Sequence, residues 1–129
     1  MTNFEHEIFM LTNLERRRHN LASLIWNDTL VYIARAHSLD LATSNIFSHI
    51  GSDGSTPQQR LHRVSNAIKF LGENIAGGRN KPEATIADWM ASSGHRANIL
   101  NSDAVYLGVG AAYAGASRYK FYATQVFGR

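Results

Sequence analysis

The sequence contains no cysteine, and this absence removes two classes of chemistry. Structural disulfides cannot form, and no thiol is present to act as a nucleophile. An oxidising compartment stays open to the protein, because many secreted proteins fold without disulfides. No apolar stretch approaches the roughly 20 residues that a membrane-spanning helix requires. An apolar share of 44% therefore predicts a globular domain held together by its core.

An excess of charge of one sign is also missing, since the formal net charge is only +3. The densest basic run, Arg16-Arg17-Arg18, lies in a helical pattern, and three such residues are typical of a solvated helix face. No basic stripe interleaved with aromatic residues accompanies the run. Nucleic acid is therefore not an expected partner.

The 129 residues fit one domain, which we expect to span residues 1–129. The N-terminus lacks the basic start and apolar middle segment of a signal peptide. Either the protein stays inside the cell, or the sequence begins after a removed leader. Helical patterning almost from the first residue favours the second interpretation.

Helical periodicity marks the first two thirds of the chain. Phe4, Ile8 and Leu11 recur at helical spacing and predict an amphipathic first helix, with polar residues such as Glu5 between them. A second helix is expected from Asp28-Thr29, a third over roughly residues 57–64 and a fourth from Pro82 to Ser92. The buried face of the second helix is predicted to comprise Leu30, Ile33, Ala34, His37 and Leu41.

The last third changes character. Leu107–Tyr113 and Tyr119–Phe127 are rich in Val, Tyr, Phe and Thr, and a connection that contains glycine joins them. This pattern predicts an antiparallel hairpin. Ala67–Leu71 is a further short strand candidate, which places Glu73 just past a strand. Helices first and strands last are typical of an α+β fold.

Standard motifs are absent. Gly108-Val109-Gly110 lacks a third glycine and lies in a predicted strand, so it is no nucleotide-binding fingerprint. No Gly-x-Ser-x-Gly elbow is present, and His6 has no second histidine at the spacing of a helical zinc site. Asn27-Asp28-Thr29 fits the glycosylation triplet, but capping of the second helix explains it better.

The histidines divide by their surroundings. His6, His19 and His62 lie on polar or charged stretches and are expected at the surface. His37 falls on the apolar face of the second helix, where a core histidine bonded to a neighbour is favoured over a ligand.

His49, Glu73 and His95 differ, because glycine, serine or asparagine surrounds each of them at the end of an element. Two imidazoles and a carboxylate would form a zinc-ligand set or an acid–base pair if they met. Their wide spacing matches no short-range metal code, so three unrelated polar residues remain an equal alternative.

Five segments follow one another in a specific order. They are Asn13-x-x-Arg16, Phe47–His49, Gly72–Ala76 (Gly-Glu-Asn-Ile-Ala), Trp89–Leu100 (Trp-Met-Ala-Ser-Ser-Gly-His-Arg-Ala-Asn-Ile-Leu) and Tyr122–Gly128. Together they resemble the bacterial branch of the CAP superfamily, also called the SCP domain. That superfamily takes in cysteine-rich secretory proteins, insect venom antigens and plant pathogenesis-related proteins. The resemblance covers nearly the whole chain.

The resemblance implies an α-β-α sandwich with about four helices on a small, mainly antiparallel sheet. It also implies a cleft with two histidines and two acids. His49 and His95 match the histidine positions, and Glu73 matches the first acid. The second acid normally lies three residues after the helix tryptophan, and Trp89 places Ser92 there. One of the four cleft residues is therefore absent.

Members of the superfamily bind zinc or magnesium in this cleft. The resemblance thus implies Zn²⁺ or another divalent cation as a cofactor, with His49 and His95 as its ligands. With a single carboxylate, water or an outside group would have to complete the metal shell.

Three functions remain open. The leading one is a secreted or cell-envelope binding module, a monomer that engages a lipid or an envelope component through the cleft. The rival is a metal-assisted hydrolase in which Glu73 is the candidate catalytic residue. In the third, the cleft residues only tie the sheet to its loops. Candidates for a lipid groove, although a core position is favoured for each, are Ile46, Phe47, Ile50 and Met90.

Overall fold

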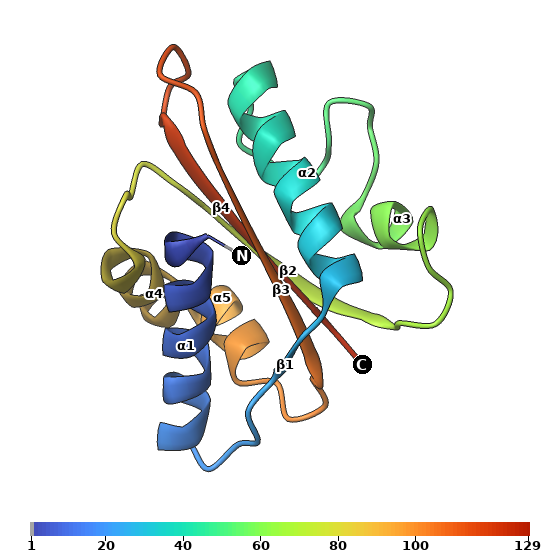
Figure 1. The fold of residues 1–129 in the computed structure, drawn as a ribbon, viewed down its shortest axis with the longest axis vertical. Helices are drawn as coiled ribbons and strands as arrows, with labels where there is room; N and C mark the ends of the chain where they lie inside the picture. Colours follow the sequence, from blue (N-terminus) through green and yellow to red (C-terminus); the bar gives the residue numbers. More distant parts are fainter. Residues whose placement is uncertain (1) are drawn as a thin grey trace.

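A computed structural model describes residues 2–129 and shows three layers, with a sheet between two layers of helices (Figure 1). A four-stranded sheet lies in the middle. Helices α1 (Asn3–Arg18), α4 (Pro82–Ala91) and α5 (Ser93–Ile99) cover one face, and α2 (Asp28–Ser44) and α3 (Pro57–His62) cover the other. The predicted α-β-α sandwich is confirmed. The sequence did not predict helix α5. The chain turns at Ser92, where α4 ends, and α5 begins at Ser93.

The sheet has the strand order β1-β3-β4-β2. Its strands are β1 (Ile25–Trp26), β2 (Phe70–Gly77), β3 (Tyr106–Tyr113) and β4 (Phe121–Gly128). Strand β4 pairs antiparallel with both β3 and β2, whereas β1 runs parallel to β3. The predicted hairpin is thus confirmed, and the sheet is mainly antiparallel.

Strand β2 lies later in the chain than the sequence predicted. Residues 67–71 were expected to be the strand, but pairing with β4 carries it to Gly77. Glu73 therefore lies inside a strand, and the prediction that it follows one is wrong. The polar Glu73 and Asn74 interrupt the apolar alternation that marks a strand in a sequence, so only the pairing partner reveals it.

Each face of the sheet has its own apolar core. On the side of α1, α4 and α5, the buried residues include Ile8, Trp89, Ile99, Leu107, Val109 and Phe127. On the side of α2 and α3, they include Leu30, Ile33, Ala34, Leu41, Leu61, Ile75, Tyr122 and Val126. The predicted buried face of α2 is therefore confirmed.

Two glycines bring α2 down onto β3. A Cβ atom at Gly108 would overlap the backbone of Leu30 and Val31, and one at Gly110 would overlap the backbone of Ala34 and Arg35. The Gly108-Val109-Gly110 segment lies in a strand, as predicted, and its glycines serve close helix–sheet packing.

Two local predictions for the helices need correction. Asn27, and not Asp28 or Thr29, caps α2, because its side chain accepts a hydrogen bond from the Leu30 amide. Arg16 is not on a solvated face, because its guanidinium is buried and donates to the carbonyls of Ala22, Ile99 and Asn101. Those carbonyls lie at the end of α5 and in loops, which the local pattern around Arg16 cannot indicate.

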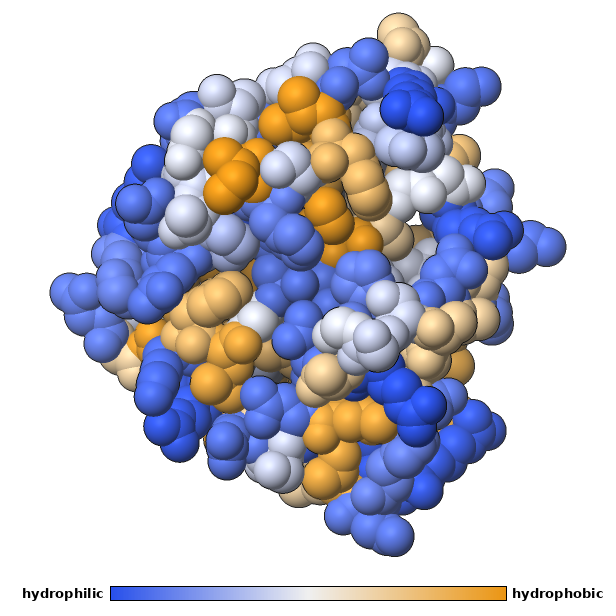
Figure 2. Space-filling view, turned by 180° about the vertical axis from the view of Figure 1, so that it is seen from behind, coloured by the Kyte–Doolittle hydropathy of each residue, from blue (hydrophilic) through white to orange (hydrophobic). Residues whose placement is uncertain are grey.

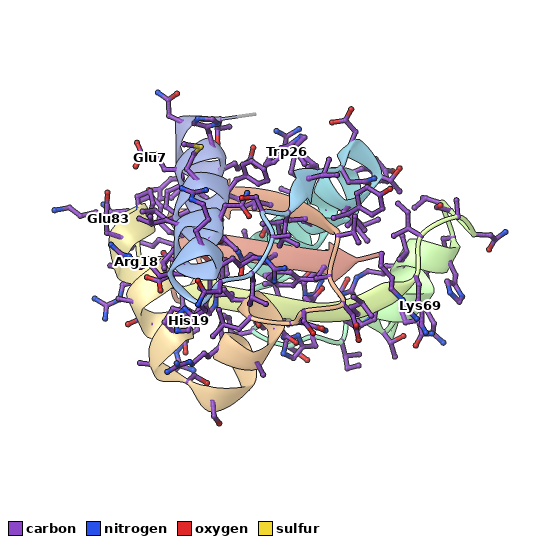
Figure 3. All side chains as sticks on the ribbon, turned by 90° about the horizontal axis from the view of Figure 1, so that it is seen from below. Glu7, Arg18, His19, Trp26, Lys69 and Glu83 are labelled. Atoms are coloured by element: carbon purple, nitrogen blue, oxygen red, sulfur yellow. The ribbon has the colours of Figure 1, made fainter. Side chains whose placement is uncertain are left out.

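The outer side of α1 is polar. Seen from below, Glu7 and Arg18 lie on the side of this helix that faces away from the sheet (Figure 3). No helix within residues 2–129 is long and apolar enough to cross a membrane.

Candidate functional site

The candidate site lies at β2, an edge strand of the sheet. Successive side chains of a strand point to opposite faces. Glu73 accordingly contacts Arg60 of α3, whereas Asn74 donates to the His95 carbonyl of α5. Strand β2, at the edge of the sheet, thus carries side chains that contact helices on both faces of the sheet.

The Glu73 carboxylate is buried and bonded on both oxygens. Its Oε1 accepts from His49 Nδ1 at 2.8 Å, and its Oε2 accepts from a terminal nitrogen of Arg60 at 3.0 Å. The side chain of Glu73 is only 2% exposed and that of Arg60 12%. A buried carboxylate requires such compensation, because an unpaired charge in the interior is strongly destabilising.

His37 of α2 forms the inner wall of the site. It is 1% exposed, and its Nε2 lies 3.8 Å from Glu73 Oε1. The same Nε2 donates to the Ser48 carbonyl at 2.8 Å, which assigns its proton to Nε2. Burial lowers the pKa of His37. The positive charge of Arg60 lowers this pKa further, whereas the negative charge of Glu73 raises it. The prediction of a hydrogen-bonded core histidine is confirmed.

His49 lies in the loop that follows α2 and is the exposed member of the site, with a side chain 48% exposed. Since Nδ1 donates to Glu73, the neutral ring keeps a lone pair on Nε2. Phe47 is 46% exposed and Ile50 is 45% exposed, so the preferred core position for these two is wrong. Both lie within two residues of His49 in the chain. Ile46 and Met90 are half-buried.

His95 lies on α5 and is half-buried. Burial lowers the pKa of this imidazole, and the nearby charge of His49 lowers it further. The ring is therefore biased toward its neutral form. Asn98 fixes α5 to the strand by donating to the Glu73 carbonyl and to the Asn74 side chain.

Ser92 sits where α4 ends and α5 begins and is half-buried. It lies three residues before His95, so the family's second acid position adjoins the helix that carries this histidine. A serine there adds a hydroxyl but no negative charge. Glu73 is the carboxylate that contacts His49 and His37.

Arg60 is the principal site residue that sequence reasoning missed. Nothing in the spacing of Arg60 points to Glu73, and the sequence around it, with His62 and Arg63, indicates an exposed basic face. His62 is indeed exposed, but Arg60 turns inward. The capping box at Thr56 predicted the helix and not the direction of its arginine.

The metal ligands available in the structure test whether the residues fit the implied metal. Within residues 2–129, no group of three or more His, Cys, Asp or Glu side chains is arranged to hold a metal ion. His49 and His95 remain as the two imidazoles of the predicted set, and the charge of His49 lowers the pKa of His95. Two protein ligands fit a cation only if water or a ligand supplies the others.

Known proteins resemble this chain along most of its length. Residues 9–127 match the cysteine-rich secretory protein family, CAP. The protein YkwD of Bacillus subtilis is 38% identical over 112 residues, which are 87% of this chain and 44% of that protein.

Solved structures agree. An extracellular protein from Bacillus anthracis that contains an SCP domain superposes with a TM-score of 0.82 at 39% identity, covering 98% of this chain and 40% of that one. An outer surface protein from Borrelia burgdorferi superposes with a TM-score of 0.88 at 21% identity, covering 99% of this chain and 96% of that one.

This chain spans less than half the length of YkwD and of the Bacillus anthracis protein. It corresponds to one part of each. Because the family match covers residues 9–127 and the identity to two bacterial relatives is 38% and 39%, the chain belongs to the cysteine-rich secretory protein (CAP) family, in its bacterial form.

Proposed function

We propose that this CAP domain is a binding module of the cell surface or the extracellular space, and that it engages its ligand through the cleft of His49, Glu73, His95 and Ser92. The location is supported by relatives described as extracellular and as an outer surface protein. We expect the domain to act as a monomer.

The bonding of Glu73 carries this proposal. A general base must present a free lone pair to the water or hydroxyl that it deprotonates. Here Arg60 and His49 hold one carboxylate oxygen each, and the side chain is 2% exposed. Glu73 is therefore suited to orienting His49, and the exposed imidazole is suited to meeting a ligand.

A divalent cation is the first ligand component that we propose. A carboxylate that fixes the tautomer of a histidine is the usual support of a metal-binding imidazole. Glu73 gives His49 this support, and the lowered pKa of His95 keeps the second imidazole neutral. In this proposal His49 and His95 hold Zn²⁺ while the bound partner or water supplies the remaining donors. The ion would link domain and partner.

The surface favours a polar ligand over a broad lipid face. Phe47 and Ile50 offer a small apolar rim beside His49. On the face drawn in Figure 2, apolar residues gather in separate patches with hydrophilic residues between them. A lipid would therefore meet only short apolar stretches on that face.

A metal-assisted hydrolase is the second candidate, and one contact favours it. The 2.8 Å hydrogen bond between His49 and Glu73 is the arrangement by which a carboxylate orients a catalytic imidazole. In this alternative Glu73 would hold the ring of His49, and His49 and His95 would hold the cation that activates the attacking water.

Zinc titration of the purified domain by calorimetry tests the binding proposal. We expect one Zn²⁺ per chain, lost in both His49→Ala and His95→Ala. The variant His62→Ala, which removes an exposed histidine of α3, should bind zinc like the parent. Unchanged zinc binding in the two cleft variants would contradict the metal proposal.

Glu73→Gln separates binding from hydrolysis. Loss of the supporting carboxylate should weaken zinc binding by about 10- to 100-fold. With fluorescent casein as the substrate, the binding module predicts no zinc-dependent turnover by the parent. A turnover that disappears in His49→Ala while casein is still bound would instead establish the hydrolase.

A further inference from the structure

Two adjoining hollows lie between α2 and α3, on the side of His37 and Arg60 that the cleft does not use. One has a volume of about 260 Å³ and the other of about 310 Å³, and both are lined by Ala36, Arg60 and Arg63. The first is also lined by His37, Asp40, Ser52, Asp53 and Ser55, and the second by Tyr32, Ile33 and Val64. We refer to the pair as the α2–α3 groove.

The polar end of the groove is rich in hydrogen-bonding groups but balanced in charge. Arg63 pairs with Asp53 at 2.8 Å, and Arg60 pairs with Glu73 at 3.0 Å. Asp40 accepts hydrogen bonds from the amide and hydroxyl of Ser52. Both guanidinium groups are therefore already paired with carboxylates, whereas carboxylates and guanidinium groups keep further acceptor and donor positions.

His37 lines the same wall and carries an unsatisfied acceptor that is buried behind it. Its Nε2 is bonded to Ser48, and its Nδ1 is buried without a hydrogen-bond partner, the one such side-chain atom within residues 2–129. A buried polar atom without a partner costs about 1–3 kcal/mol. Because Nε2 carries the proton, Nδ1 can be satisfied only by a donor such as a hydroxyl group.

The other end of the groove is aromatic and apolar. Tyr32 is 64% exposed and Val64 is 47% exposed, although both lie on ordered helical or turn segments beside Arg63. An exposed aromatic ring on a rigid helix offers a flat apolar face with a polar tip. Such a face packs well against the C–H face of a pyranose ring.

We propose that the α2–α3 groove binds an uncharged glycan. A sugar combines hydroxyl groups that both donate and accept with an apolar ring face. The groove offers partners for both: paired Arg and Asp side chains at one end, and the exposed Tyr32 at the other. None of His49, Glu73 and His95 lines the groove, so this site is distinct from the proposed metal ligands, although Arg60 contacts both Glu73 and the groove.

The test is a titration of the ¹⁵N-labelled protein with chitotetraose and with maltotetraose, followed by NMR. Saturable shifts are expected in α2, α3 and the 51–56 loop for at least one sugar, with a Kd in the range of about 1 mM. Tyr32→Ala should weaken binding at least about tenfold, equal to about 1.4 kcal/mol. Arg63→Ala should weaken it in the same direction.

Matched controls keep this result specific. Tyr113→Ala removes a tyrosine that is 62% exposed on β3, outside the groove, and should leave the affinity unchanged. His49→Ala should also leave it unchanged, which separates this site from the proposed cleft. The spectra of the free variants report whether each one is folded.

Three outcomes would overturn the proposal. The first is the absence of saturable shifts with both sugars at about 10 mM. The second is equal sugar affinity in the parent and in folded Tyr32→Ala. In the third, inorganic phosphate saturates the groove more tightly than either sugar, which would make it an anion site.

Discussion

Two buried carboxylates in this domain have different surroundings. Glu5 of α1 is 1% exposed and accepts hydrogen bonds from Arg35 and from the amides of Thr2 and Ala111. Glu73 of β2 is also buried, but one of its partners, His49, is half exposed and another neighbour, His37, keeps an unsatisfied atom. Both clusters reach solvent through one partner, since the side chain of Arg35 is 43% exposed and that of His49 is 48% exposed. They differ in their anchoring, because Glu5 also accepts from two backbone amides, whereas Glu73 is bonded by side chains.

The difference separates a structural role from a functional one for the same residue type. Burial alone would raise the pKa of Glu5, but the bonds from Arg35, Thr2 and Ala111 outweigh it and hold the pKa below its ordinary value. Those bonds join α1, α2 and β3. Around Glu73, the bonds instead orient a side chain that faces outward.

Gly110→Ala should have the largest effect, because it disrupts the packing on which the Glu5 cluster depends. The added Cβ would overlap the backbone of Ala34 and Arg35, and backbone cannot move aside as a flexible side chain can. We expect a loss of about 4 kcal/mol or more in the free energy of unfolding. Urea denaturation measures it.

Gly94→Ala is the matched control, because a Cβ at Gly94 meets no atom within 4 Å. It should be neutral or stabilise α5 by up to about 1 kcal/mol. Equal stability of the two variants would show that α2 does not lie as close to β3 as described.

Glu5→Gln should follow, with a loss of about 2–3 kcal/mol. The glutamine side chain keeps the shape of glutamate but loses the negative charge to which Arg35 and the backbone amides of Thr2 and Ala111 donate hydrogen bonds. Glu7→Gln, on the outer side of α1 (Figure 3), should change stability by less than about 0.5 kcal/mol. Similar losses in both variants would refute the anchoring role of Glu5.

Arg60→Gln should cost about 1–2 kcal/mol, less than the loss at Glu5. Glu73 would keep its bond to His49 and stay next to solvent on that side. Arg63→Gln, which breaks an exposed pair with Asp53, should cost less than about 0.5 kcal/mol. A larger loss in Arg60→Gln than in Glu5→Gln would reverse the proposed division of roles.

The pH dependence should be the smallest effect and should belong to the Glu73 cluster. Since burial lowers the pKa of His37 below 6.5, the unfolded chain binds the proton more readily than the folded chain. Stability should be fully present above about pH 6.5 and fall as the pH drops from there toward the lowered folded pKa. Glu73 and Asp40 oppose this shift, and Arg60 reinforces it.

Melting temperatures at pH 7.5 and pH 5.5 measure this dependence. His37→Gln should reduce the fall on acidification, while His95, whose pKa is also lowered, keeps part of it. The exposed control His62→Gln should behave like the parent. An undiminished fall in His37→Gln would remove His37 as its source.

The sequence predicted those features that depend on neighbouring residues. Helical spacing identified α1 and α2, strand composition identified the hairpin, and the apolar face of α2 identified His37 as a core residue. Separated motifs placed His49, Glu73 and His95 in one cleft by resemblance. The structure adds the contact between His49 and Glu73 and the effect of the His49 charge on the pKa of His95.

Features that depend on distant partners escaped prediction. Arg16 is buried because its guanidinium donates a hydrogen bond to the Ile99 carbonyl at the end of α5. Glu5 is buried because Arg35 and the Ala111 amide of β3 donate hydrogen bonds to its carboxylate. Arg60 turns inward because Glu73 lies across the fold. Each of these polar residues resembles a surface residue until its partner is known, so periodicity alone misplaces them.

The strand order β1-β3-β4-β2 has a consequence for how the chain folds. The two central strands, β3 and β4, are the last elements along the chain, and every helix lies before them. Both apolar cores therefore depend on residues after 105, and α2 has little sheet to cover until these are available. Such long-range pairing makes folding slow relative to helical proteins of the same size. During synthesis, helices α1 to α5 would therefore emerge before the two strands against which their apolar faces pack.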